Sequence, residues 1–374
     1  MVDFNVVVIG AGAAGLLTAF YLKKIKPDIS ILIVNKTASV EETNTYYAKG
    51  GIAAPISPSD TVEDHIRDTL EAGAGLCKIE AVKFIIENAV DAVKELIKIG
   101  VPFDVRGGFL DLAREGGHSK PRILHVADTT GKSLINTLYR LVLNSDIKIL
   151  FNTLITKITK QEDGNFALDG ILKDYALISL KCNYVVVATG GCGFLYRYTS
   201  NPPGATGTGI ALCARAGASI SGMEFIQFHP TALFSVEDDP FFLITEAIRG
   251  KGAWLVNQNN ERFLFKYHRA GELAPRDIIS FAIHKEKNSG NQSFLLLSHI
   301  DRDTLTESFP GVIAELTKRG YNPFTDKIPV VPAAHYLCGG VDVSLDGESS
   351  IKGLFVNGET ANTGLHGCLL YTSP

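Results

Sequence analysis

The sequence predicts an α/β protein in which a Rossmann-like domain is split by an inserted α+β domain. Three observations predict this fold. Residues 4–36 contain a strand, a glycine-rich turn, a helix and a second strand in one continuous unit. From about Gly222 the sequence changes to aromatic and polar residues rich in His, Arg and Glu. Strand-like segments return at residues 341–343 and 353–356, where we expect the first domain to be completed.

The first unit has the pattern of a dinucleotide-binding turn. Residues 6–9 are a short run of β-branched residues, as expected for a parallel strand buried on both faces. Gly10, Gly12 and Gly15 complete the pattern G-x-G-x-x-G, and a helix is expected over residues 13–24. These glycines permit a tight turn, the approach of a pyrophosphate and close packing of the helix, whose N-terminus faces the phosphates. A purely structural turn is the alternative, but the flanking strand and helix favour the nucleotide.

The second strand, expected over residues 29–34, ends in Asn35 and Lys36. An ordinary NAD or FAD site has an acidic residue here, which binds the ribose hydroxyls. Asn35 can still hydrogen-bond a ribose. Lys36 has two interpretations that the sequence does not separate, which are contact with an adenosine phosphate and a solvated surface lysine.

The remaining elements follow from apolar spacing and from turn residues. A loop is expected over 41–58, helices over 61–74, 79–99 and 206–217, and strands over 147–158, 166–180 and 184–188, with a polar turn at 161–165. The strand at 184–188 is closed by Thr189, Gly190 and Gly191. We predict a first domain over residues 1–222, an inserted domain over 223–340 and a return segment over 341–374.

Composition excludes several classes of protein. At 374 residues and 45% hydrophobic residues, the chain can bury more than one core. Its formal net charge of −4, with both signs interspersed, does not favour nucleic acid or an anionic membrane. The six cysteines show no zinc-binding spacing, and we expect no metal. No apolar run approaches the ~20 residues of a membrane helix, and the first strand leaves no room for a signal peptide. We therefore expect a cytoplasmic protein.

Eight longer motifs identify a family. They are TNTYYAKGGIAAP (43–55), REGGHSKPRILHVADTTG (114–131), YVVVATGG (184–191), EFIQFHPTAL (224–233), FLITEAIRGKGA (242–253), ELAPRDI (272–278), VPAAHYLCGGV (331–341) and GLFVNGETANTGLHG (353–367). With these motifs the chain resembles the flavoproteins of the fumarate reductase and succinate dehydrogenase superfamily, and within it the L-aspartate oxidase family. The resemblance implies a Rossmann-like FAD-binding domain with an inserted α+β capping domain.

The resemblance also implies FAD and the residues that hold it. Residues 43–51 are expected to run along the flavin, Gly190 and Gly191 to form a second flavoprotein motif, and Glu359 to lie near the ribityl chain. Thr208 stands where relatives often carry an aspartate. The expected cofactor-binding residues are Gly10, Ala11, Gly12, Ala13, Ala14, Gly15, Asn35, Lys36, Asn44, Thr45, Tyr46, Tyr47, Ala48, Gly50, Gly51, Leu154, Gly190, Gly191, Thr208 and Glu359.

Asn44 bears on how the flavin is attached. In membrane-bound fumarate reductases and succinate dehydrogenases, a histidine at the matching position, six residues before the paired glycines, is bonded covalently to the flavin. This chain has Asn44 there. We therefore expect non-covalent FAD, reoxidised by oxygen or by free fumarate.

The family motifs also supply candidate catalytic residues. A C4 dicarboxylate needs cationic or hydrogen-bonding groups at each end, and the resemblance assigns this role to His229, Thr245, Arg249, Arg276 and His335. Arg276 matches the superfamily's proton-transfer arginine, although an arginine is effectively always protonated and suits an electrostatic role equally well. Each of these residues has a purely structural alternative, such as a buried histidine bonded to a carbonyl or a surface ion pair. Only their joint occurrence in family motifs favours catalysis.

Glu115, in the segment REGGHS, is the candidate for distinguishing L-aspartate from succinate. A carboxylate attracts an ammonium group and repels a bare dicarboxylate. The alternative is a glutamate that begins a loop and accepts bonds from backbone amides. His118 and Arg122 in the same segment are weaker candidates, which we expect to shape the loop.

The resemblance implies oxidation of L-aspartate, or another C4 dicarboxylate, to iminoaspartate, the first step of NAD synthesis through quinolinate. Quinolinate synthase would then act downstream. The family continues beyond the GLHG motif with a second substrate arginine and a helical domain, whereas this chain reads CLLYTSP from Cys368. Two alternatives stay open, which are a soluble fumarate reductase and a non-catalytic FAD-binding fragment.

Overall fold

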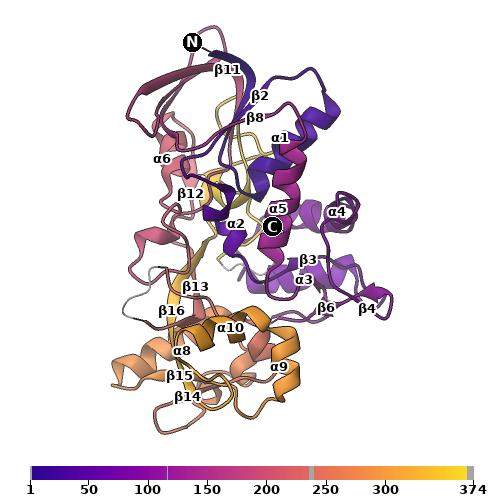
Figure 1. Cartoon of the computed structure of the whole chain (residues 1–374), viewed down its shortest axis with the longest axis vertical. Coiled ribbons are helices and arrows are strands. Elements are labelled where there is room, and N and C mark those ends of the chain that lie inside the picture. The colour runs from indigo at the N-terminus through magenta and orange to yellow at the C-terminus, as the bar shows by residue number, and fades with distance from the viewer. Residues whose placement is uncertain (1, 116, 236–239, 369–374) are drawn as a thin grey trace.

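The computed structural model describes residues 2–115, 117–235 and 240–368. Its upper part in Figure 1 is built on a seven-stranded sheet and its lower part on a four-stranded sheet. The end of the return segment predicted from the sequence, residues 369–374, lies outside the described residues. The three-part domain division stays a prediction. Within the described residues, no helix is both long enough and apolar enough to cross a membrane.

The larger sheet has the order β8-β2-β1-β11-β10-β9, and β18 also pairs with β11. Its strands are β1 (Val2–Ile9), β2 (Ile31–Val34), β8 (Lys148–Leu150), β9 (Leu154–Lys160), β10 (Phe166–Ile171), β11 (Leu177–Val187) and β18 (Leu354–Val356). The strands β8, β2, β1, β11 and β18 pair in parallel, whereas β10 is antiparallel to both its neighbours. Because β18 joins from the far end of the chain, the return segment completes the first sheet, as the sequence predicts.

Helices cover both faces of this sheet. Val6 and Val8 of β1 face a core that also contains residues of α1 (Ala13–Ile25) and α5 (Thr130–Leu143). Val7 and Ile9, which point the other way, belong to a second core with residues of α6 (Thr208–Arg215). A strand buried on both faces needs such a continuous apolar run. The Rossmann-like α/β fold is therefore confirmed.

The four-stranded sheet, in the order β13-β16-β15-β14, is antiparallel and carries Gln227, His229 and His335. Its strands are β13 (Ile226–Leu233), β14 (Trp254–Asn257), β15 (Ser293–Leu296) and β16 (Lys327–Leu337). The helices here are α7 (Ala247–Gly250), α8 (Arg276–Asn288), α9 (Arg302–Ser308) and α10 (Pro310–Lys318). They enclose a separate core that includes Leu255, Ile279 and Leu295. This arrangement is the inserted α+β part of the fold.

The chain enters and leaves the inserted part side by side. Strand β12 (Ile220–Ser221) pairs with β17 (Gly340–Asp342), which pairs in turn with β19 (Ala361–Asn362). The helices α2 (Asn44–Tyr47), α3 (Val62–Ala72) and α4 (Ile79–Lys98) lie at the middle height of the molecule in Figure 1. The short strands of this part of the chain are β3 (Ile52–Ala53), β4 (Val105–Arg106), β5 (Phe109–Leu110), β6 (Leu112–Ala113) and β7 (Ile123–Leu124).

Two strands predicted from the sequence are wrong. The segment 147–158 forms two strands, β8 and β9, because the chain turns at Asn152, which has a φ of 52°. The segment 166–180 is also divided, by a turn at Tyr175 with a φ of 65°, and β11 then continues without a break through 184–187. Helices α5, α8, α9 and α10 were not predicted.

Candidate active site

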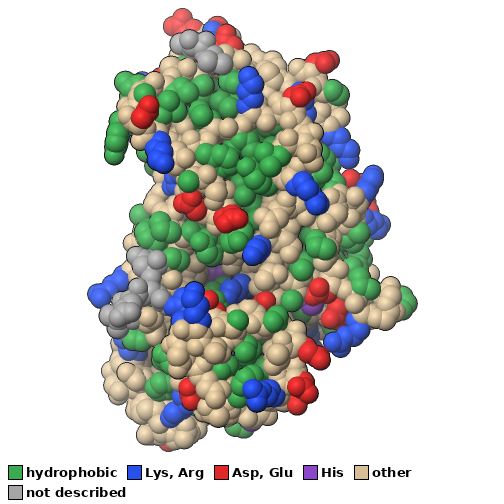
Figure 2. Space-filling view, viewed as in Figure 1, with side chains coloured by type: hydrophobic (Ala, Val, Ile, Leu, Met, Phe, Trp, Pro, Cys, Tyr) green, Lys and Arg blue, Asp and Glu red, His purple; other side chains and the backbone are tan. Residues whose placement is uncertain are grey.

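A cavity of about 1590 Å³ lies between the two parts of the molecule. Figure 2 shows the surface hollowed there, with acidic, basic and histidine side chains in the recess. All the expected cofactor-binding residues line this cavity except Gly15 and Gly191, which lie just behind it. The expected catalytic residues Glu115, His229, Thr245, Arg276 and His335 also line it, whereas Arg249 does not.

The glycine turn lies at the end of β1 and leads into α1. Gly10 has a φ of 114°, and a Cβ there would lie 2.2 Å from the carbonyl oxygen of Ala188. A Cβ at Gly15 would lie 2.0 Å from the carbonyl oxygen of Gly10. Both positions therefore require glycine. Gly12, the N-cap of α1, has only the Thr45 hydroxyl at 3.4 Å, so its open side faces the cavity.

Asn35 and Lys36 are engaged within the protein. The Asn35 side-chain oxygen accepts a hydrogen bond from the Ala11 amide at 3.2 Å, so Asn35 braces the glycine turn. The Lys36 ammonium donates to the hydroxyls of Thr206 and Thr208 at 2.9 and 3.4 Å, and burial lowers its pKa. The interpretation of Lys36 as a solvated surface lysine is therefore wrong, and its contact with a phosphate stays a prediction.

Glu359 joins three segments at the middle of the cavity. Its carboxylate accepts from the Asn44 side-chain amide at 3.1 Å and from the Leu337 backbone amide at 2.9 Å. A Cβ at Gly191 would lie 2.2 Å from the same carboxylate, which explains a glycine there. Burial raises the pKa of Glu359 to about 7, although these hydrogen bonds act in the opposite direction.

Two arginines and two glutamates form the charged centre of the site. Arg276, the first residue of α8, donates from Nε to the Glu246 carboxylate and from Nη1 to Gln227 at 2.9 Å. Its Nη2 lies 3.7 Å from a Glu115 oxygen. Arg249 lies 3.2 Å from Glu246 on its other side. All four charged side chains are at most 16% exposed, so these charges interact with little screening by water.

Electrostatics separate the roles of these four groups. Burial raises the pKa of Glu115, as does the nearby Glu246 carboxylate, and although Arg276 and Arg249 oppose both effects, the pKa reaches about 7. Burial lowers the pKa of Arg276, but Glu246 and Glu115 outweigh it and the net pKa is raised. Arg276 is therefore a fixed cation, whereas Glu115 changes its charge near neutral pH.

His229 and His335 line the same cavity from the adjacent strands β13 and β16. Their ring centroids are 5.2 Å apart. Burial, with the Arg276 charge, lowers the pKa of His335 to about 3 and that of His229 well below its ordinary value. Ser200 lies 3.0 Å from Nδ1 of His335. Both histidines are therefore neutral hydrogen-bonding groups, and Thr245 is buried beside them along the same cavity.

Sequence reasoning missed Glu246 and Gln227, which hold Arg276 in place. The only sequence signal was the spacing of Glu246, three residues before Arg249 in the motif TEAIRG. It also missed Lys49, whose ammonium lies 3.4 Å from the centre of the Phe242 ring and whose pKa burial lowers to about 8.

The glycine turn, the positive end of α1 and the adjoining long cavity fit the shape and charge of FAD.

Comparison with known proteins agrees with this geometry. Residues 5–369 match the family described as FAD binding domain. An L-aspartate oxidase of Pseudomonas aeruginosa is 40% identical over 97% of this chain and 70% of its own length. This chain belongs to the L-aspartate oxidase family. The chloroplastic L-aspartate oxidase of rice is 44% identical over 97% of this chain, and that of Nostoc is 41% identical over 98%. FAD is the cofactor of this family fold.

Solved structures show the same architecture. A mutated E. coli quinol fumarate reductase aligns with a TM-score of 0.93 and 31% identity over 99% of this chain and 67% of its own. A Mycobacterium smegmatis Sdh1 aligns with a TM-score of 0.81 and 30% identity over 98% of this chain and 64% of its own. This chain spans 58% of the length of the rice L-aspartate oxidase and 64% of that from Nostoc.

Proposed function

We propose that this chain oxidises L-aspartate to iminoaspartate, with oxygen or fumarate as the final electron acceptor. The observation that carries the proposal is the meeting of Glu115 and Arg276 in the cavity. Their charged groups lie 3.7 Å apart, and a Glu115 oxygen lies 3.6 Å from the Cβ position of Gly50, in the segment expected to run along the flavin. An amino dicarboxylate carries both charges that this pair complements.

In this proposal the positive groups bind the substrate's carboxylates. Arg276 is directed by Glu246 and Gln227, so its guanidinium cannot rotate freely. The rings of His229 and His335 are neutral, so they and the Thr245 hydroxyl can form hydrogen bonds with the substrate's carboxylates without adding charge to the site. Holding the substrate in one orientation in a site screened from water contributes much of the rate enhancement of such reactions.

Bound FAD supplies the chemistry by accepting a hydride from the substrate's α-carbon. The substrate's nitrogen must also lose a proton when the imine forms. In our proposal Glu115 faces the ammonium group, and its pKa of about 7 suits a residue that holds the ammonium and takes its proton. Arg276 stays protonated and stabilises negative charge at the carboxylate end.

The finer parts of the sequence prediction also belong to this proposal. The supporting relatives are named L-aspartate oxidases, some of them chloroplastic. We propose a cytoplasmic enzyme whose product is taken up by quinolinate synthase. A fumarate reductase is the second candidate, because a quinol fumarate reductase shares the fold at 31% identity. Arg276 would then donate a proton to the alkene.

The test is anaerobic mixing of the FAD-bound protein with L-aspartate, followed by absorbance at about 450 nm, where oxidised flavin absorbs. Bleaching that air reverses, with formation of hydrogen peroxide, is the expected result. Bleaching by succinate and not by L-aspartate would establish the second candidate instead. A flavin that bleaches only with dithionite would refute both and favour a non-catalytic FAD-binding protein.

A further inference from the structure

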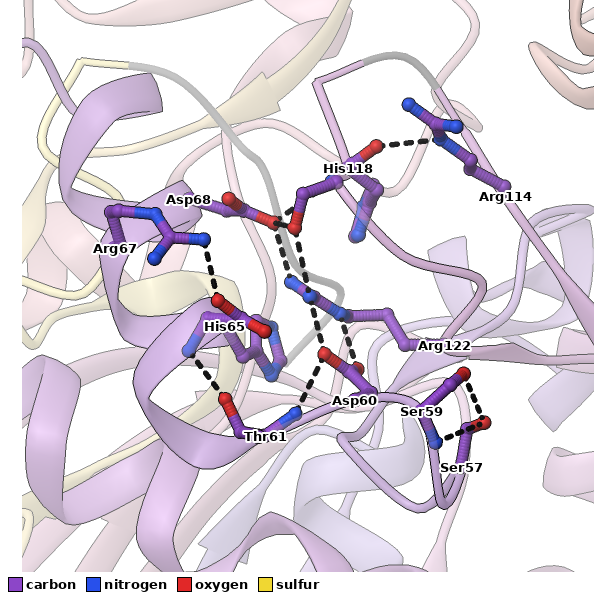
Figure 3. A network of polar contacts seen from close by, with 12 residues as sticks. Ser57, Ser59, Asp60, Thr61, His65, Arg67, Asp68, Arg114, His118 and Arg122 are labelled. Atoms are coloured by element: carbon purple, nitrogen blue, oxygen red, sulfur yellow. Dashed lines mark hydrogen bonds and ion pairs between the residues drawn. The ribbon is translucent and has the colours of Figure 1, made fainter.

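A buried ionic cluster lies behind the loop that carries Glu115. At its centre is Arg122, which is completely buried. Its Nε and Nη2 each donate to one oxygen of Asp60 at 2.8 Å, and its Nη1 donates to Asp68 at 2.9 Å. Figure 3 shows Arg122 between the two aspartates, of which Asp60 precedes α3 and Asp68 lies within it. The cluster thus joins α3 to the chain just before β7.

The same cluster holds the Glu115 loop. Asp68 accepts hydrogen bonds from the Ser119 backbone amide at 2.9 Å and from the Ser119 hydroxyl at 2.5 Å. Arg114 closes the loop by donating from Nε to the His118 carbonyl at 2.7 Å, as Figure 3 also shows. The Arg122 amide donates to the Ala113 carbonyl at 3.2 Å. Glu115 therefore lies in a short loop that is fastened on both sides.

The composition of the cluster argues for positioning over simple stabilisation. Two carboxylates and one guanidinium are removed from water, and desolvation offsets much of their mutual attraction. Apolar residues of similar volume often stabilise a fold equally well. Such a cluster does, however, fix the orientation of the Arg122 side chain. Two of its guanidinium nitrogens donate to Asp60, and the remaining one donates to Asp68.

We propose that Asp68 and Arg122 are positioning residues that set the place of the Glu115 carboxylate opposite Arg276, and so determine the preference for an amino dicarboxylate. This rests on the proposed function. The cluster lies outside the substrate cavity, since neither Asp68 nor Arg122 lines it, and it acts only through the loop. A displacement of Glu115 weakens its contact with an ammonium group, whereas Arg276 keeps the hydrogen bonds to Glu246 and Gln227 that orient it toward a carboxylate.

The experiment compares four FAD-bound variants with the wild type, namely Asp68→Asn, Glu115→Gln, the double variant and Val142→Ala. The control Val142→Ala removes buried apolar atoms from the core around α1 and α5, and Val142 does not line the cavity. Flavin reduction is measured with L-aspartate and with succinate. We expect Asp68→Asn to lower kcat/KM for L-aspartate by about tenfold, through KM, with little effect on succinate, and Val142→Ala to keep the wild-type ratio of the two substrates.

The double variant tests whether Asp68 acts through Glu115. If it does, the double variant loses no more preference for L-aspartate than Glu115→Gln alone, since residues of one functional unit are not additive. Losses that multiply, or that are equal for both substrates, would overturn the proposal. If Asp68→Asn fails to fold, Ser119→Ala takes its place, because it removes one of the two hydrogen bonds to Asp68 from this residue.

Hydrogen exchange keeps this test separate from that of the proposed function. In Asp68→Asn we expect the backbone amides of residues 114–115 and 117–119 to exchange about tenfold faster or more, with amides of β13 unchanged. If the wild type is reduced by neither substrate, the proposed function fails, and the exchange data alone decide the positioning role. Unchanged exchange at these loop residues would then refute it.

Discussion

The raised pKa of Glu115 predicts how stability depends on pH, and the substitution Glu115→Gln tests it. The pKa rises from an ordinary 4.5 to about 7 in the folded protein, so the folded state binds the proton more tightly than the unfolded state does. The stabilising contribution is complete below the unfolded pKa and is lost as the pH rises through the folded pKa. Its full size is about 3 kcal/mol, from about 1.4 kcal/mol per pKa unit.

Most of this contribution lies in an accessible range of pH. Relative to Glu115→Gln, which cannot titrate, the wild type should lose roughly 2 to 3 kcal/mol of unfolding free energy between pH 5 and pH 8. Urea denaturation of both proteins at several pH values measures the difference. Glu359 also has a pKa of about 7, but its contribution to the pH dependence is the same in both proteins and therefore drops out of the difference. Parallel stability curves for the two proteins would refute the reasoning.

Three further predictions follow from the site. Arg276→Met should slow flavin reduction by L-aspartate about 100- to 1000-fold in stopped-flow experiments and leave FAD content unchanged, because it removes the fixed positive charge that lies beside Glu115; an unimpaired rate would contradict this role. Gly12→Ala should weaken FAD binding to the apoprotein and change its unfolding free energy by less than about 1 kcal/mol, whereas Gly15→Ala, whose Cβ would lie 2.0 Å from the Gly10 carbonyl, should cost several kcal/mol by urea denaturation. Because Asn44 offers no imidazole, acid precipitation should release FAD into the supernatant, and a yellow pellet would show covalent attachment.

The local parts of the fold were predictable from the sequence. In the first βαβ unit, the helix predicted over residues 13–24 agrees with α1 to within one residue at each end. The apolar pattern and the glycines that predict it lie within one short segment. The turns at Asn152 and Tyr175 were not predicted. Asparagine adopts a positive φ more readily than most residues, but Asn152 lies inside an apolar run that favoured one strand, and tyrosine gives no such turn signal. Tertiary pairing imposes these turns, since β8 pairs with β2 while β9 pairs with β10.

The site shows the same division between local pattern and tertiary contact. Motifs marked Glu115 and Arg276, although 161 positions separate them in the chain, and the structure brings their charged groups within 3.7 Å. The sequence allowed Asn35 to hydrogen-bond a ribose, which stays a prediction, but it did not show that the Asn35 side-chain oxygen accepts a hydrogen bond from the Ala11 amide. Glu246 was missed because its role comes from ion pairs with Arg249 and Arg276, and Arg276 lies on another helix. A sequence pattern shows which residues occur together, but it does not show which of them pair.

The charge balance of the site explains why Glu115, and not an arginine, is suited to select the substrate. With both glutamates ionised, Arg249 and Arg276 are neutralised, so the centre carries no net charge. A dicarboxylate without an amino group brings two negative charges, which favour protonation of the group that titrates most easily, Glu115. L-aspartate brings an ammonium group that compensates the Glu115 carboxylate directly. Under the proposed function, the two classes of substrate would therefore bind different protonation states of Glu115, and selectivity would follow from its pKa near neutral pH as well as from shape.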